Sequence, residues 1–114
     1  MTDHQAIERT ILDICSEDEY GLWEILWRIR TVYPQLELET ARALAANAVI
    51  ELNANGYVTI EERTPERSIA VTGGAVRNLV AAPGPWAEPT AGAVTYWAFA
   101  TEQGRQRYLH LARA

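Results

Sequence analysis

Apolar positions repeat with the period of an α-helix three times in the first half of the chain. The first run extends from about Asp3 to Cys15, the second from Tyr20 to Tyr33, and the third from Glu39 to about Ala54. In each run, apolar residues return every three or four positions, which places them on one face of a helix. The sequence therefore predicts three helices before residue 55.

Turn-forming and capping residues separate these runs. The stretch Ser16–Glu19 offers N-caps and first-turn acids, so we expect the second helix to begin near Glu19. Pro34 disfavours helical geometry at the residue before it and ends that helix. Asn55-Gly56 ends the third helix, because glycine suits the left-handed conformation that closes helices.

The period changes to two after Gly56. Two runs rich in β-forming residues, Tyr57–Ile60 and Ser68–Thr72, flank the charged stretch Glu61–Glu66, which contains Pro65. This pattern predicts a β-hairpin with a polar turn.

Residues 73–93 are rich in proline and glycine and give a mixed signal. A short helix over Ala75–Ala82 is followed by Pro83-Gly84-Pro85-Trp86, which indicates either an ordered excursion or a mobile loop. Val94–Ala100 returns to strand character. Thr101 then caps a last helix that extends to about Ala112.

This order of elements resembles the winged helix-turn-helix family of bacterial regulators. Leu52–Val58 is similar to that family's exit from helix three into the first wing strand, and Ala100–Arg105 to its last junction between strand and helix. The resemblance implies an α+β fold with three N-terminal helices, a β-wing with a long excursion over about 57–100, and a C-terminal helix over about 101–113. Members of the family bind DNA as transcription regulators or serve as protein-interaction modules, so the fold does not choose between them.

Length and composition predict one domain over residues 1–114, without a membrane span. At 114 residues the chain supports a single core, and no segment approaches the roughly 18 apolar residues that a membrane span needs. No basic region followed by an apolar stretch opens the chain, so we expect a cytoplasmic protein. The single cysteine, Cys15, excludes an intramolecular disulfide and a cysteine-rich zinc site.

Charge is distributed unevenly along the chain. Residues 1–66 carry 13 acidic residues against five arginines, a net charge of −8, whereas residues 67–114 carry five arginines against two glutamates, a net charge of +3. A polyanion would therefore be repelled by the first part and attracted only by the second.

The third helix is the element that reads DNA bases in the family that the chain resembles. Seven apolar residues share one arc that we expect to face the core: Leu38, Ala41, Leu44, Ala45, Ala48, Val49 and Leu52. The opposite arc holds Glu39, Ala43, Ala46, Asn47 and Ile50, with Arg42 to one side. Asn47 can read adenine, but the acid and the aliphatic side chains make a poor reading face. These positions are either plain surface residues of an alanine-rich helix or, with an exposed Ile50 beside Ala43 and Ala46, a protein contact.

Arginines of the wing and the last helix offer further contacts to phosphate. Arg63, Arg67 and Arg77 can lie along a DNA backbone, although three glutamates, Glu61, Glu62 and Glu66, alternate with the first two. On the last helix, Arg105, Arg107 and Arg113 are expected to have no acidic neighbours. They form either a solvated face or a patch for phosphate or an acidic partner.

Tryptophan is abundant, and two tryptophans lie four residues apart on the second helix. Trp23 and Trp27 flank an apolar stripe that is complete without them, so they either pack on the core or form a dimer seam or ligand cleft. The proline-rich segment that ends in Trp86 can fold back to cover them.

Enzymatic chemistry has little support in the sequence. His4 and His110 lie near opposite termini, and Cys15 falls on an apolar helix stripe, where a buried and inert thiol is expected. We therefore expect no catalytic residues, no metal site and no cofactor.

Two hypotheses of function follow. In the first, the protein is a homodimeric transcription regulator that binds double-stranded DNA through Arg42, Asn47, Arg63 and Arg67. In the second, it is a winged-helix module that binds itself or another protein, without DNA. Its contact residues would then be Trp23, Trp27, Ala43, Ala46 and Ile50.

Overall fold

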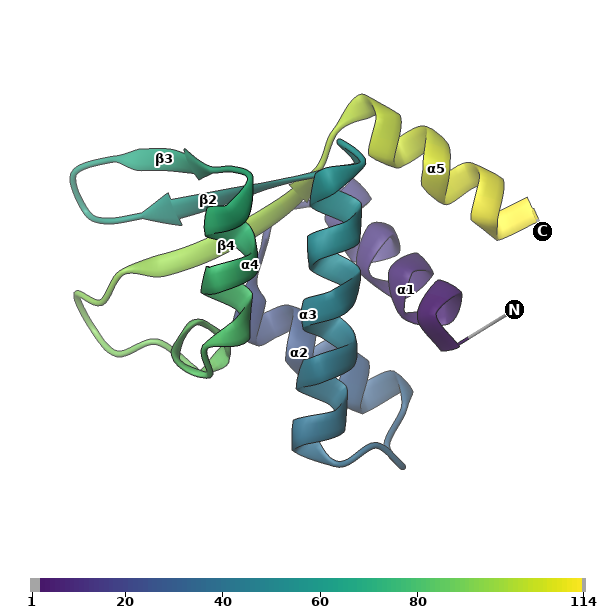
Figure 1. Cartoon of the computed structure of the whole chain (residues 1–114), viewed down its shortest axis with the longest axis horizontal. Coiled ribbons are helices and arrows are strands. Elements are labelled where there is room, and N and C mark those ends of the chain that lie inside the picture. The colour runs from purple at the N-terminus through teal and green to yellow at the C-terminus, as the bar shows by residue number, and fades with distance from the viewer. Residues whose placement is uncertain (1–2, 114) are drawn as a thin grey trace.

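Five α-helices and a four-stranded antiparallel sheet make up residues 3–113, the part of the chain that the computed structural model describes (Figure 1). The elements in chain order are α1 (Asp3–Glu17), β1 (Tyr20–Gly21), α2 (Leu22–Val32), α3 (Leu38–Ala54), β2 (Val58–Arg63), β3 (Ser68–Val71), α4 (Gly74–Ala81), the 3-10 helix η1 (Gly84–Trp86), β4 (Thr95–Ala100) and α5 (Glu102–Arg113). The fold is α+β, as predicted, and its element order is compatible with a winged helix.

The three predicted N-terminal helices are present, with one difference at the start of the second. Tyr20 and Gly21 form the short strand β1, which pairs with β4, and α2 begins at Leu22 rather than near Glu19. Two residues are too few to show a strand period, so the pattern of the sequence could not separate them from the helix that follows.

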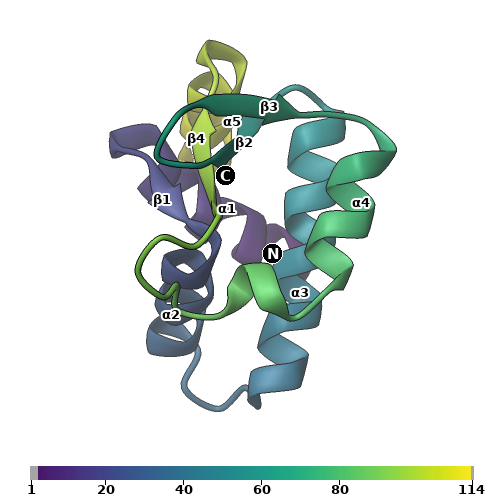
Figure 2. The same ribbon diagram turned by 90° about the vertical axis from the view of Figure 1, so that its left-hand side faces the viewer.

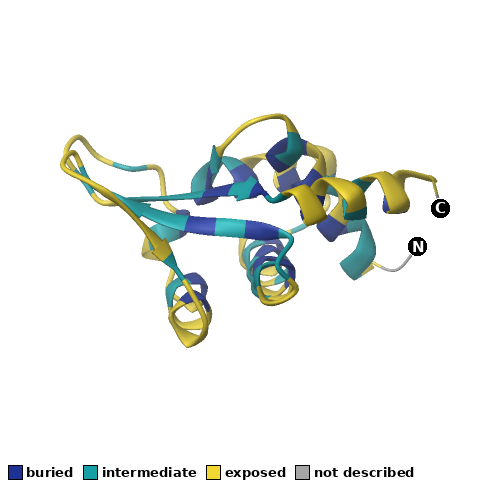
Figure 3. Ribbon diagram, turned by 90° about the horizontal axis from the view of Figure 1, so that it is seen from above, coloured by how far each residue is buried: buried dark blue, intermediate teal, exposed yellow. Residues whose placement is uncertain are grey.

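The sheet has the strand order β1-β4-β2-β3. Ile60 of β2 is the partner of both Ala98 in β4 and Val71 in β3. The prediction that Glu61 and Glu62 belong to the turn is wrong, because β2 continues to Arg63 and the turn is confined to residues 64–67. Figure 3 shows the buried positions gathered where the sheet meets the helices, whereas the β2–β3 end is exposed.

The core lies between α1, α2, α3 and the sheet. Its largest fully buried side chains include Ile11, Leu12, Leu22, Ile25, Ile29, Val49, Leu52 and Ile60. One residue that we expected in this core, Leu38, lies outside it. Leu38 is 45% exposed, because it begins α3 ahead of the helix's first buried residue, Ala41, whereas Leu44 is half-buried and packs against the core.

The excursion between β3 and β4 folds back onto the helices. The helix α4 packs against α3 and buries Val76 and Val80, and η1 then contacts α2. Figure 2 shows α4 beside α3, with the following segment crossing toward α2. Trp86 is 3% exposed, and its indole Nε1 donates a hydrogen bond to the Val80 carbonyl at 2.9 Å. The excursion is thus anchored at both α3 and α2.

The two junctions that carry the family resemblance have the predicted local geometry. Gly56 has a φ of +77°, the left-handed conformation expected after the third helix. The Thr101 hydroxyl accepts a hydrogen bond from the Gly104 N–H at 3.0 Å, so Thr101 is the N-cap of α5 as predicted. The same hydroxyl donates to the Gly56 carbonyl at 2.6 Å and thereby ties the two junctions together.

Candidate interaction surface

The helix α2 buries one face and leaves a tryptophan on another. Leu22, Ile25, Leu26 and Ile29 are buried, whereas Trp27 is 67% exposed. Trp27 is the most exposed of the large hydrophobic side chains in residues 3–113. An indole on the surface of a helix that already has a complete core face costs solvation free energy, and tryptophan is the residue type most enriched at binding hot spots.

Trp23 is half-buried because the sequence places a glycine beneath its ring. A Cβ at Gly21 would lie only 2.1 Å from the nearest Trp23 ring atom, so the indole lies against the backbone of β1. On β4, Trp97 meets Trp23 edge to face, with ring centroids 5.2 Å apart and an interplanar angle of 81°. Trp97 is held in turn by its indole N–H, which donates to the Thr95 hydroxyl at 2.9 Å.

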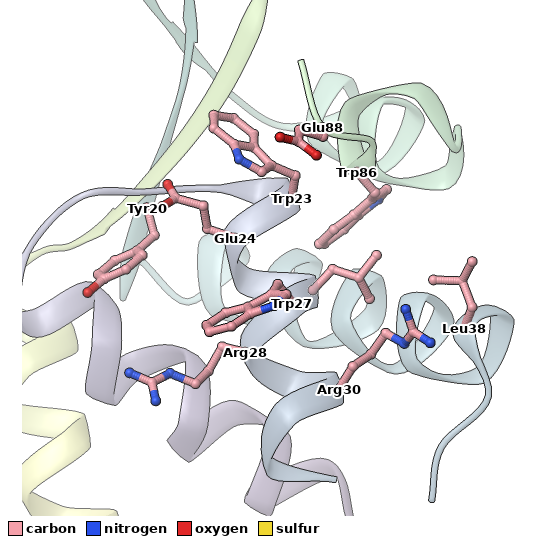
Figure 4. A pocket seen from close by; sticks show the side chains of 10 residues that line it. Tyr20, Trp23, Glu24, Trp27, Arg28, Arg30, Leu38, Trp86 and Glu88 are labelled. Carbon is pink, nitrogen blue, oxygen red and sulfur yellow. The ribbon is translucent and has the colours of Figure 1, made fainter. Parts of the chain in front are cut away.

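Tryptophans of α2 and of the excursion line a cavity of about 640 Å³ that is open to solvent (Figure 4). We call this cavity the tryptophan groove; it is lined by Tyr20, Trp23, Glu24, Leu26, Trp27, Arg28, Arg30, Leu38, Trp86 and Glu88. An adjoining cavity of about 350 Å³ shares Trp23 and Glu88 with it and continues past Pro85 to Val94 and Tyr96. Together they form an aromatic depression of the kind that peptides and protein segments bind.

Two indole N–H groups in the groove are free to bind a ligand. Trp86 and Trp97 use theirs inside the fold, but those of Trp23 and Trp27 have no hydrogen-bond partner within the described residues. Each can donate to a carbonyl oxygen of an incoming chain.

Charged side chains lie on opposite sides of the groove. Figure 4 shows Glu24 and Glu88 on the side of Trp23, and Arg28 and Arg30 on the other, with Trp27 between them. Glu24 accepts a hydrogen bond from the Gly21 N–H at 2.9 Å and helps to cap α2. Glu88, Arg28 and Arg30 form no ion pair with another residue of the described range.

The structure does not bring the four predicted DNA contacts together. Arg42 lies near the start of α3 and pairs with Glu39 at 2.5 Å, and Asn47 is exposed on the same helix. Arg63 and Arg67 lie at the β2–β3 turn, which Figure 1 shows well apart from the start of α3. Arg67 is exposed.

Arg63 is held by two carboxylates and a ring. Its guanidinium pairs with Glu19 and, at 2.8 Å, with Glu61, and it lies 5.0 Å above the centroid of the Trp97 ring. The hydrogen bond that the Arg63 guanidinium donates to the Glu19 carboxylate is the main cause that raises the pKa of Arg63. A phosphate would have to compete with both acids for this guanidinium.

Only part of the predicted partner interface lines the groove. Trp23 and Trp27 do, but Ala43, Ala46 and Ile50 do not. The expectation that Ile50 is exposed is wrong: Ile50 and Ala46 are half-buried and pack against the core, while Ala43 is exposed. The helix α3 is contacted by α1, α2, β2 and also α4, so it has less open surface than the sequence alone suggested.

Two of the three arginines that we expected to be unpaired on the last helix have acidic neighbours, whereas Arg113 is exposed and forms no ion pair within the described residues. Arg107 pairs with Glu8 of α1 at 3.1 Å, and Arg105 lies 3.6 Å from Glu102. Glu8 is only 5% exposed, so this ion pair fastens α5 to α1. Sequence separation hid the contact, because Glu8 and Arg107 are 99 positions apart.

Metal-ligating side chains do not gather in residues 3–113. No group of three or more His, Cys, Asp or Glu side chains there is placed to hold a metal ion. Cys15 is buried, as predicted, and burial raises the pKa of its thiol to about 12, so it stays protonated and unreactive at neutral pH. Among the described helices, none is long and apolar enough to cross a membrane.

Sequence reasoning identified the two tryptophans of the groove but missed its charged rim. Arg30 lies three residues after Trp27 and therefore on the same side of α2, a signal that a helical projection of the sequence contains. Glu88 had no such signal, because its position depends on how the proline-rich segment folds back.

Comparison with known proteins gives no relative from which a function can be transferred. No protein-family model, no curated protein and no solved structure matches the chain.

Proposed function

We propose that this chain is a winged-helix domain that acts as a protein-interaction module, with the tryptophan groove as its binding surface. The observation that carries the proposal is Trp27, which is 67% exposed at the centre of a cavity that three other aromatic residues line. Binding of a partner would remove this ring from water, which is the usual energetic role of a tryptophan hot spot.

The excursion of the wing supports this proposal over DNA binding. In DNA-binding winged helices the third helix and the wing both face the duplex. Here α4, which follows β3, packs against α3, and the remaining exposed positions of α3 include Glu39, Glu51 and small side chains. Two of the four candidate DNA contacts, Arg42 and Arg63, are already paired with carboxylates.

The same excursion creates the groove. Trp86, Glu88 and Pro85 come from the segment between β3 and β4, and they line the two cavities together with residues of α2. The insertion therefore reduces the exposed surface of α3 and adds an aromatic surface beside α2.

Selection of binding peptides from a random displayed library tests this proposal. We expect peptides that bind the folded chain in the micromolar range. Trp27→Ala should weaken their binding about tenfold or more, because the central ring is lost. Leu109→Ala is the matched control: Leu109 is an exposed apolar residue of α5 that lines neither cavity, so its removal should leave binding unchanged.

A duplex-DNA arm completes the test. We expect no binding to mixed-sequence duplex at low salt. DNA affinity that falls with salt and is lost in Arg67→Ala, together with no peptide or protein association that depends on Trp27, would overturn the proposal in favour of the regulator.

A further inference from the structure

The charges on the tryptophan groove form a pattern that is complementary to itself. Glu88 lies on one side of Trp27 and Arg30 on the other, and neither has an ion-pair partner within residues 3–113. A partner that fits this surface must carry a basic group opposite Glu88 and an acidic group opposite Arg30. A second copy of the groove supplies both groups, its own Arg30 as the basic group and its own Glu88 as the acidic group.

Twofold symmetry converts this pattern into a contact. In a dimer with one twofold axis, each residue of the shared patch meets a different residue of the same patch on the other copy. If the axis passes Trp27 at right angles to the line from Glu88 to Arg30, Glu88 of one copy faces Arg30 of the second copy, and the reverse pair forms on the other side. An axis parallel to that line would instead place like charges together, so charge selects the first arrangement.

Exposed apolar side chains lie where such a contact would bury them. Trp27 at the centre is 67% exposed, and Leu38 and Val94, which line the groove and the adjoining cavity, are 45% and 46% exposed. The two free indole N–H groups add donors for carbonyl oxygens of the opposing copy.

We infer that the occupant of the tryptophan groove is a second copy of this chain, in a twofold dimer with Trp27 at its centre and Glu88 facing Arg30 of the second copy on both sides. This inference rests on the proposed function, because it names the partner of the proposed surface. One helix and one loop make a face at the lower end of specific interfaces, about 1,200 Å² or less in total, so the dimer is reversible and depends on concentration.

Sedimentation equilibrium of single and double charge reversals tests this inference. We expect the wild-type chain to dimerise, and Arg30→Glu and Glu88→Arg each to weaken the dimer about tenfold or more, because each places like charges opposite one another. The double variant R30E/E88R should recover most of the lost affinity, because the reversed pair is again complementary. Trp27→Ala should abolish the dimer.

Matched controls separate a local effect from a change in net charge. Arg67→Glu and Glu66→Arg reverse the same charges at the exposed β2–β3 turn, outside both cavities, and should leave the dimer unchanged. All substituted positions are exposed, so circular dichroism should show the same fold for every variant. Equal effects of the groove and control reversals would overturn the inference.

The outcomes distinguish the partner from the surface. A wild-type chain that stays monomeric up to about 1 mM, or a double variant no better than the single ones, overturns the second copy as partner. If peptides then still bind in a manner that depends on Trp27, the groove remains a protein-binding surface for a different protein. If they do not, the proposed function fails as well.

Discussion

At the scale of single residues, two glycines decide how aromatic and backbone groups approach one another. Gly21 leaves room for the Trp23 ring, and Gly104 lets α5 lie against the start of β2. A Cβ at Gly104 would come within 1.9 Å of the Tyr57 carbonyl oxygen, a backbone atom that no side-chain rotation can move away. Neither demand was visible in the sequence, because each depends on a contact between distant elements.

We therefore predict that Gly104→Ala is strongly destabilising although alanine favours helices. The methyl group must displace α5 from Tyr57, which should lower the free energy of unfolding by about 1–3 kcal/mol or more. Urea denaturation measures the change. Gly74→Ala is the control, since a Cβ there meets no atom within 4 Å, and it should alter stability by about 1 kcal/mol or less. Equal effects of the two substitutions would contradict the close approach.

At the scale of elements, periodicity predicted the regular segments and missed what depends on tertiary contacts. The helices α3 and α4 agree with their predicted ranges within a residue, because each has a long apolar stripe or a clear cap. The strand β1 was missed because only its pairing with β4 defines it. The exposure of Ile50 was mispredicted for a related reason, since it depends on how the other elements pack around α3.

The candidate site was also predicted only where helical periodicity defines it. Trp23 and Trp27 were identified because their spacing puts them on one flank of a helix whose core stripe was already complete. The groove around them was not, because Trp86 and Glu88 reach it through the fold of a proline-rich segment that has no period. The sequence had allowed Trp86 to cover both tryptophans, yet Trp27 stays 67% exposed.

The anchor of that segment is the Trp86 indole, so Trp86→Phe should loosen the excursion. Phenylalanine fills much of the same space but leaves the Val80 carbonyl without its donor, which we expect to cost about 1–3 kcal/mol of stability. Amide hydrogen exchange in α4 should also become faster. The control Trp27→Phe changes an exposed ring and should cost about 0.5 kcal/mol or less. Unchanged exchange in α4 would show that the anchor lies elsewhere.

At the scale of the whole molecule, paired arginines and an acidic first half make a polyanion a poor partner. The chain carries a net charge of −5, and four of its ten arginines lie within 4.0 Å of a carboxylate in the described structure. The tryptophan groove suits a protein partner better, since it combines an exposed indole ring with unpaired charges of both signs.

NMR of the indole N–H groups tests the groove as a protein-binding surface most directly, because the four tryptophans divide by their contacts. Trp86 and Trp97 donate hydrogen bonds inside the fold, whereas Trp23 and Trp27 have none within the described residues. On addition of the selected peptides, or on raising the concentration of the chain itself, we predict that the Trp27 and Trp23 signals shift and that the Trp86 signal stays in place. Duplex DNA should move none of them. If no indole signal responds to peptide or to chain concentration, and DNA instead shifts the backbone signals of residues 64–67 in a manner that salt reverses, the groove is not the functional surface.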